Sequence, residues 1–196
     1  MDLKQSLESY LAALASNSAT PGGGAAAALS AAQATALFSM VARLSKDESV
    51  DWAAHAQQMD DYRLNFSKLA RDDADAFDKV MDAYKLPQGD QRTETLQNAL
   101  KLAATPPLET VLSCWEILHL CRPFIEAANK NVVTDSGIAV SLLKSAIESS
   151  MYNVFINLKF IKDEDYKKGL NTKTSLILDE LDSITKTLSS LVYSRI

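Results

Sequence analysis

Glycine, proline and cysteine are all scarce in this chain. It has six glycines, five prolines and two cysteines among 196 residues. So few residues that interrupt regular structure favour long helices over many short strands joined by turns. Cys114 and Cys121 are seven residues apart, which is about 10 Å along a helix and too far for a disulfide. The absence of a disulfide framework is typical of a cytoplasmic protein.

Positive charge is also low. The chain has 20 basic and 25 acidic residues, and its net charge is −5 at pH 7. Nucleic acids and anionic membrane surfaces are bound through a basic face, so we expect neither as a partner. Its 47% of apolar and 23% of charged residues are ordinary for a globular protein. A chain of this size can bury a full core, and we predict one domain over residues 1–196.

Motifs for metal binding and for nucleophilic catalysis are missing. Nothing in the sequence resembles a CxxC pair or a Cys/His metal-ligand spacing. His55 and His119 lie in no motif, so we expect both at the surface or in packing. No signature of a Ser-His-Asp or Cys-His nucleophile is present.

One uncharged stretch, residues 25–42, reaches the length of a membrane span. Nine of its 18 residues are alanine, and four others are polar: Ser30, Gln33, Thr35 and Ser39. The preceding residues show neither the basic start nor the compact apolar core of a signal peptide. The stretch therefore predicts a buried helix of a soluble protein.

The spacing of apolar residues predicts helices along the whole chain and no strand. Leu3 and Leu7 lie on one face of the first helix, and Pro21 begins the second with Thr20 as its N-cap. Pro123 should bend or end the helix that contains it. The predicted helices cover residues 2–15, 21–45, 50–85, 90–104, 106–128, 136–158 and 164–193. The fold class is therefore all-α, a single bundle of about six to seven helices.

Asp73 lies where the long third helix should carry an apolar residue. Apolar side chains recur at multiples of seven along this helix, and Asp73 falls on their seam. The other members of the seam are Trp52, Met59, Phe66 and Val80. A buried carboxylate is costly unless it is paired or used, and burial raises its pKa towards neutral pH. Asp73 is therefore either a general acid or base, or an acid paired with a cation from another helix.

Three adjacent glycines, Gly22, Gly23 and Gly24, precede the alanine-rich helix. Backbone N–H groups at a helix start can bind an anion, and glycines allow it to approach closely. This is not a P-loop, because the GK[ST] ending is missing and no strand precedes it. The alternative is tight helix packing, since Gly24 continues a ridge of alanines spaced four residues apart.

A second polar group surrounds the predicted helix at 136–158. Asp135 stands at its start as an N-cap, and Gly137 leaves room for a ligand beside that carboxylate. Asn153 and Asn157 lie one turn apart further along, where they bind substrate or form a hydrogen-bond network between helices or subunits. Asn153 is 18 residues from Asp135, about 27 Å along one helix. The ligand is therefore long, or the two clusters meet across a dimer, or one of them is structural.

These segments together resemble the cyclodeaminase/cyclohydrolase family of tetrahydrofolate enzymes. The resemblance covers nearly the whole chain, and its motifs are specific in this order and spacing although each is weak alone. They are residues 20–28 (TPGGGAAAA), 73–77 (DADAF), 84–87 (YKLP), 107–110 (PLET), Asn129, Asn131, 134–139 (TDSGIA) and 153–159 (NVFINLK).

The resemblance implies a helical, dimeric enzyme that acts on folate one-carbon units. It implies that Asp73 and Asp135 are the acids near the substrate. The residues expected to bind a folate-type substrate are Gly22, Gly23, Gly24, Asn129, Asn131, Gly137, Asn153 and Asn157. No metal and no cofactor beyond the tetrahydrofolate substrate is expected. The apolar stripes on the first and last helices independently predict a homodimer.

The resemblance leaves the reaction open. We favour formiminotetrahydrofolate cyclodeaminase; the alternatives are methenyltetrahydrofolate cyclohydrolase and a non-catalytic dimerising member of the family. Two positions depart from the family pattern. Residues 44–49 hold one Lys and two acids where a basic stretch is usual, and Phe155 stands where a basic residue is common. If those positive charges hold the folate's glutamate tail, binding here is weaker or differently arranged.

Overall fold

The computed structural model describes residues 2 and 5–196, and in this part of the chain every regular element is a helix. The helices are α1 (Leu7–Leu14), α2 (Gly23–Leu44), α3 (Trp52–Lys85), α4 (Asp90–Leu120), α5 (Arg122–Ala127), α6 (Val133–Phe160) and α7 (Glu164–Tyr193). The prediction of an all-α bundle is confirmed. Leu3, assigned to the first helix, lies outside the described residues.

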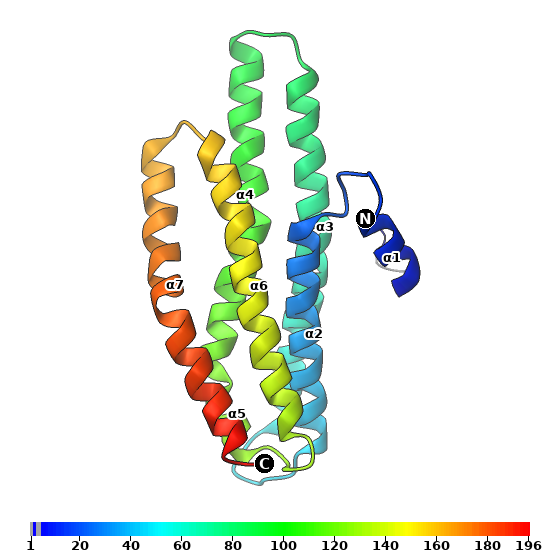
Figure 1. The fold of residues 1–196 in the computed structure, drawn as a ribbon, viewed down its shortest axis with the longest axis vertical. Coiled ribbons are helices and arrows are strands. Elements are labelled where there is room, and N and C mark those ends of the chain that lie inside the picture. Colours follow the sequence, from blue (N-terminus) through cyan, green and yellow to red (C-terminus); the bar gives the residue numbers. More distant parts are fainter. Residues whose placement is uncertain (1, 3–4) are drawn as a thin grey trace.

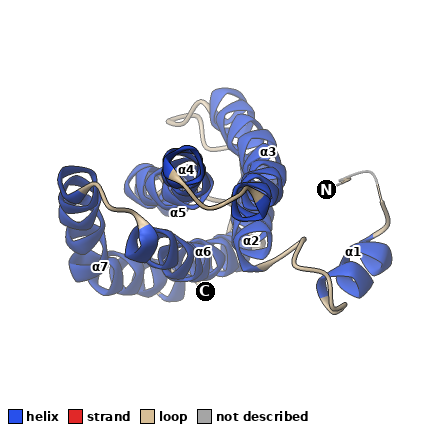
Figure 2. Cartoon of the chain, turned by 90° about the horizontal axis from the view of Figure 1, so that it is seen from above, coloured by secondary structure: helices blue, strands red, loops and turns tan. Residues whose placement is uncertain are grey.

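The long helices form two layers (Figures 1 and 2). α2, α6 and α7 lie side by side in one layer, while α3 and α4 form the other, and α2 packs most extensively on α3 and α6. The short helix α1 lies beyond the edge of α2, apart from the rest of the bundle. The buried apolar side chains form two clusters, a larger one that includes Phe38, Phe66 and Leu143 and a smaller one that includes Val80, Leu100 and Val154.

The alanine-rich helix α2 is a core helix. Gly24, Ala28 and Ala32 are buried, so their small side chains let the neighbouring helices approach closely. By length and hydropathy α2 could cross a membrane, but 61% of that window is buried in the bundle. A polar cluster closes its far end, where Ser39 Oγ donates to Asp60 Oδ1 at 2.9 Å and Arg43 lies 2.6 Å from Asp60 Oδ2.

The Pro106-Pro107 pair does not begin a helix, as the sequence suggested, but lies inside α4. Pro107 has no backbone N–H, so the carbonyl of Ala103 four residues earlier lacks its usual helical partner. Asn157 of α6 supplies the missing donor, with Nδ2 3.2 Å from that carbonyl oxygen. The helix therefore continues through the prolines because a neighbouring helix repairs its hydrogen bonding.

This arrangement predicts a measurable coupling between Asn157 and Pro107. Asn157→Ala leaves the buried Ala103 carbonyl without a donor, which should lower the free energy of unfolding by about 1–3 kcal/mol. In a Pro107→Ala background the new backbone N–H can bond the Ala103 carbonyl. There Asn157→Ala should lower the free energy of unfolding by about 1 kcal/mol less than it does in the wild type. Urea denaturation of the four proteins measures the coupling. An equal cost in both backgrounds would contradict this account of the proline pair.

α4 ends at Leu120, and Pro123 lies in the first turn of α5. The prediction that Pro123 bends or ends its helix is therefore confirmed. α5 covers the lower end of α3, where Phe124 stacks on His55 with ring centroids 3.3 Å apart. His55 is buried and neither ring nitrogen has a hydrogen-bond partner, so burial lowers its pKa to about 4.

Burial of His55 predicts a loss of stability in mild acid. The pKa of His55 is about 4 in the folded protein, against 6.5 for an ordinary histidine in the unfolded chain. As the pH falls from 6.5 towards 4, the unfolded chain therefore takes up a proton that the folded protein does not, and the free energy of unfolding decreases. Between pH 7 and 5 this decrease amounts to about 2 kcal/mol. His55→Phe should remove that part of the pH dependence of urea unfolding, whereas His119→Phe, at an exposed position, should keep it. The same pH dependence in wild type and His55→Phe would exclude His55 as its source.

Candidate functional site

Asp73 lies on the side of α3 that faces the start of α2. Its half-buried carboxylate accepts a hydrogen bond from the backbone N–H of Ala25, in the first turn of α2. A β-carbon placed on Gly24 would overlap this carboxylate. Gly24 therefore lets the acid of one helix reach the N-terminal N–H groups of another.

The contact between Gly24 and Asp73 gives this glycine a role other than binding an external anion. The carboxylate of Asp73 itself occupies the N-terminal end of α2, where an external anion was predicted. The helix also begins two residues later than expected, at Gly23 with Gly22 as N-cap, rather than at Pro21 with Thr20. The tight-packing alternative is therefore supported for Gly24, with the packed group being a carboxylate.

Burial raises the pKa of the Asp73 carboxyl to about 6, because desolvation outweighs the hydrogen bond from the Ala25 N–H. Among the residues that the structure describes, no cation pairs with this carboxylate, so the alternative of an acid paired with Lys or Arg is not found there. A carboxyl that titrates near neutral pH can both accept and return a proton during a reaction. Perturbed titratable groups of this kind cluster at functional sites.

A cavity of about 330 Å³ opens beside Asp73. One side of α3 lines it with Asp73, Phe77, Val80 and Tyr84, spaced at i, i+4, i+7 and i+11. The remaining lining residues are Ala19, Thr20, Gly22, Gly23, Gly24, Met81, Leu100, Ala103, Asn153, Ile156, Asn157 and Phe160. An apolar, aromatic-lined hollow with a few polar groups is the usual form of a small-molecule site. This aromatic wall was not predicted from the sequence, although the helical spacing from Asp73 points to it.

Asn153 and Asn157 line the same cavity. Asn157 Nδ2 donates to the Ala103 carbonyl, as described, and to the Asn153 backbone carbonyl at 2.9 Å. Asn153 Nδ2 donates to the Ser149 carbonyl at 3.1 Å. Both amides are thus held in place by their nitrogens. The structure brings together Asp73, the three glycines and both asparagines, as expected of one site.

The second predicted cluster lies at the other end of α6. Asp135 is in the first turn rather than at the N-cap, which is Val132. A β-carbon on Gly137 would lie 3.1 Å from Val192 Cγ1, so this glycine lets α7 approach closely. It also lines a separate hollow of about 440 Å³ between the start of α6 and the end of α7. Asn129 bonds the Leu44 carbonyl through Nδ2 at 2.9 Å, which ties the loop to the end of α2. Asn131 is exposed beside it. None of these four residues lines the Asp73 cavity.

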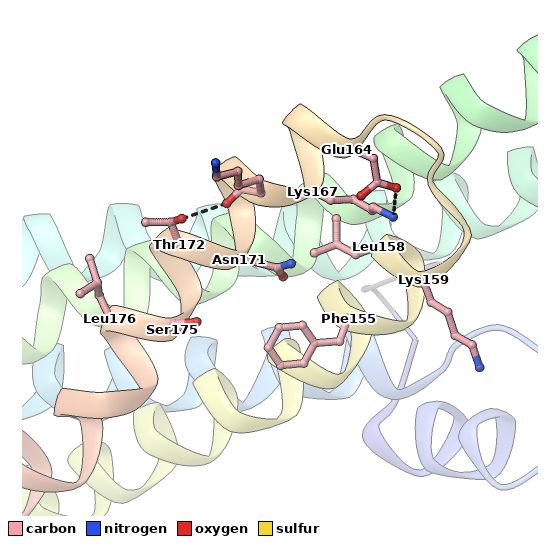
Figure 3. A pocket seen from close by; sticks show the side chains of 10 residues that line it. Phe155, Leu158, Lys159, Glu164, Lys167, Asn171, Thr172, Ser175 and Leu176 are labelled. Atoms are coloured by element: carbon pink, nitrogen blue, oxygen red, sulfur yellow. Dashed lines mark hydrogen bonds and ion pairs between the residues drawn. The ribbon is translucent and has the colours of Figure 1, made fainter.

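A larger hollow of about 780 Å³ lies between the C-terminal half of α6 and the N-terminal half of α7 (Figure 3). Phe155 and Asn171 point into it from the two helices. Lys167 is paired with Glu164 at 2.5 Å, and Lys159 extends outward. This hollow is open to solvent and contains no buried titratable group, so we place the candidate site at the smaller Asp73 cavity.

The residues that the structure describes contain no group of three or more His, Cys, Asp or Glu side chains that could hold a metal ion. Cys114 and Cys121 are both buried and unpaired. Burial raises the pKa of both thiols, so neither is an activated nucleophile. Among the described residues that line the cavity, Asp73 is the one carboxyl, and its pKa is raised.

Comparison with known proteins identifies the family of the chain. The formiminotransferase-cyclodeaminase family matches residues 6–175, which include the glycines, Asp73 and both cavity asparagines. The chain belongs to this family.

Members of the formiminotransferase-cyclodeaminase family resemble the chain over its length. A methenyltetrahydrofolate cyclohydrolase of Methylorubrum extorquens is 32% identical, with 98% of each chain covered. A crystal structure of formiminotetrahydrofolate cyclodeaminase from Thermotoga maritima superposes with a TM-score of 0.89 at 30% identity and covers 97% of both chains. The formimidoyltransferase-cyclodeaminase of Sus scrofa is 31% identical, but the chain spans only 37% of its length.

Neither residues 44–49 nor Phe155, the two positions that depart from the family resemblance, line the Asp73 cavity of their own subunit. Residues 44–49 follow the C-terminal end of α2, whereas the Asp73 cavity is at its N-terminal end. A helix of 22 residues is about 33 Å long, so a basic stretch there could not reach the cavity in the same subunit. Phe155 lines the open hollow of Figure 3 instead.

Proposed function

We propose that the protein is an enzyme of tetrahydrofolate one-carbon chemistry and that the Asp73 cavity is its active site. The observation that carries this proposal is the Asp73 carboxyl, which lies half-buried against the start of α2 with its pKa raised to about 6. The aromatic wall of the cavity suits a flat pterin ring, and the two asparagines suit its polar edge. The family relationship supports the substrate class.

The reaction that fits these groups is proton transfer at the carbon between N5 and N10 of the folate. In the cyclodeaminase reaction, N10 attacks the formimino carbon, N10 loses its proton and ammonia leaves. In the cyclohydrolase reaction, water attacks the methenyl carbon and loses a proton. The C–N5 bond then breaks as N5 takes up a proton and the new hydroxyl loses its own, which gives 10-formyltetrahydrofolate with the net release of one proton. The electrophilic carbon is part of a cationic amidinium-like group in both, so the chemistry needs no metal. Asp73 accepts the proton and, in the first reaction, returns it to the departing amine.

We place cyclodeaminase first and cyclohydrolase second. The Thermotoga maritima structure, which has the former name, shares the whole fold of this chain. The Methylorubrum extorquens relative, which has the latter name, matches it over the full length as well. The transferase activity in the name of the animal relatives is not proposed, because the chain spans only about a third of those proteins. We expect the protein to act in the cytoplasm and as a homodimer.

An assay with both substrates tests the proposal. Purified protein is offered 5-formiminotetrahydrofolate and 5,10-methenyltetrahydrofolate, and ammonia release and methenyl absorbance are followed. Ammonia release with rising absorbance identifies a cyclodeaminase, and falling absorbance above the spontaneous rate identifies a cyclohydrolase. Turnover of neither folate would refute the proposal and leave a non-catalytic member of the family.

A further inference from the structure

The Asp73 cavity is elongated along α3. α2 begins well below the tip of the α3–α4 hairpin (Figure 1), and the cavity lies between the parts of α3, α4 and α6 that continue beyond it. Asp73 lines the end of the cavity next to α2, and Tyr84 lines the end next to the hairpin tip. The eleven residues between them span about 16 Å along the helix axis. An elongated ligand with its reacting atom at Asp73 would therefore point its other end towards the hairpin tip.

Two cations lie just beyond Tyr84. Arg92 and Lys162 line a hollow of about 420 Å³ between the tip of the α3–α4 hairpin and the loop from α6 to α7, which we call the Arg92 hollow. The Arg92 guanidinium lies over the Tyr84 ring, 5.7 Å from its centroid. Among the described residues, neither cation has an ion-pair partner, and no Lys or Arg lines the Asp73 cavity itself. The positive charge thus begins where the cavity ends.

One face of α4 runs past both spaces. It consists of Arg92, Leu96, Leu100 and Ala103, which are spaced at i, i+4, i+8 and i+11. Leu100 and Ala103 line the Asp73 cavity. Arg92 and Leu96 line the Arg92 hollow. A ligand that extends from Asp73 along this face therefore passes from an apolar surface to a guanidinium.

We propose that Arg92 and Lys162 bind the carboxylates of the first glutamate of a tetrahydrofolate, and that the protein recognises folates with a short glutamate tail. The proposal rests on the proposed function and deepens it. A folate carries its pterin, its aminobenzoyl ring and its glutamate in line, and the carboxylates are ionised at neutral pH. With the pterin against Phe77, the aminobenzoyl ring lies against Tyr84 and the glutamate leaves the cavity beside Arg92. A guanidinium binds a carboxylate through two parallel hydrogen bonds.

The surroundings of the Arg92 hollow favour one glutamate over a long tail. Its two cations match the two carboxylates of a single glutamate, and each further glutamate adds one more negative charge. Asp90 lines the same hollow and would repel it. Lys85 and Lys101, on adjoining turns, are already paired with aspartates, and Lys159 lines the open hollow between α6 and α7 instead. Affinity should therefore stop rising after the first glutamate.

Binding of 5-formyltetrahydrofolate, measured by titration calorimetry, tests the proposal without turnover. The three probes are the pteroate, which lacks glutamate, the monoglutamate and the triglutamate. We expect the Kd to fall roughly 10–100-fold from the pteroate to the monoglutamate, because charge-assisted hydrogen bonds are gained. From one glutamate to three it should change by no more than about fivefold, which is the effect of exposed ion pairs.

Substitution of Arg92 separates recognition of the glutamate from packing. Arg92→Gln should remove most of the gain in affinity from the first glutamate while the Kd of the pteroate changes little. Arg92→Lys keeps the charge and should retain part of that gain. The matched control is Arg71→Gln, at an exposed position of α3 that lines neither the cavity nor the Arg92 hollow. This control should bind all three probes as the wild type does.

Each other outcome decides against a specific part of the proposal. Equal affinity of the wild type for the pteroate and the monoglutamate would overturn it and leave the proposed function standing. A further tenfold gain from one glutamate to three would refute the preference for short tails. If Arg92→Gln weakened binding of the pteroate as much as that of the monoglutamate, Arg92 would act only through its packing on Tyr84. Binding of none of the three probes would refute the proposed function itself.

Discussion

Asp73→Asn should abolish most turnover without unfolding the protein. The substitution keeps the volume and an oxygen that can accept the Ala25 N–H, but removes the group that transfers protons. We expect the rate with the better folate substrate to fall about 10²–10⁴-fold. A raised carboxyl pKa means that the ionised form destabilises the fold, fully above pH 6 and not at all below 3.8. The variant should therefore be up to about 3 kcal/mol more stable than wild type at pH 8, with most of the difference lost by pH 4.

Asp75→Asn is the matched control. Asp75 is two residues away on the exposed side of the same helix, so its substitution should leave both rate and stability nearly unchanged. Steady-state kinetics and urea unfolding at several pH values measure both properties. If Asp73→Asn keeps full turnover, or if it unfolds the protein, Asp73 is not the catalytic group.

Gly24→Ala should be almost as damaging to turnover, although it adds only one methyl group. Alanine in a helix interior normally stabilises by roughly 0.5–1 kcal/mol relative to glycine. At this position the new β-carbon would overlap the Asp73 carboxylate, so the acid must move out of the cavity. We expect a rate loss on the order of 10²-fold and a loss of stability of about 1–3 kcal/mol.

A second helical glycine provides the control for Gly24→Ala. A β-carbon added to Gly169 of α7 meets no atom within 4 Å, so Gly169→Ala should gain stability by roughly 0.5–1 kcal/mol and keep full activity. Melting curves and initial rates of both variants make the comparison. An active Gly24→Ala variant would show that close contact between Gly24 and Asp73 is not required.

Periodicity predicted most of the fold because the helices are long and few residues interrupt them. The seam position of Asp73 predicted its burial for the same reason, since a seven-residue repeat leaves little doubt about which face packs inward. The continuation of α4 through Pro106 and Pro107 was not predicted, because local rules treat proline as a helix breaker. Only the tertiary contact with Asn157 shows how the freed carbonyl is satisfied.

The function of individual glycines and amides was less predictable. Gly24 and Gly137 look alike in sequence, yet one makes room for a carboxylate and the other for Val192. Asn129 looks as available as Asn153, but its side chain is used to hold the end of α2. Which atom fills the space beside a small residue depends on a distant segment, and no local pattern reports it.

The pH dependence of kcat/KM is the most direct test of the central claim, that the buried Asp73 carboxyl is the proton-transfer group of this site. With the folate that the protein turns over, kcat/KM corrected for the spontaneous reaction should rise as the pH passes through about 6, the pKa of that carboxyl, because the ionised form accepts the proton from N10 or from the attacking water. The rise should be missing from the residual activity of Asp73→Asn. A wild-type profile that is flat between pH 5 and 8, or a rise that persists unchanged in the variant, would contradict the account.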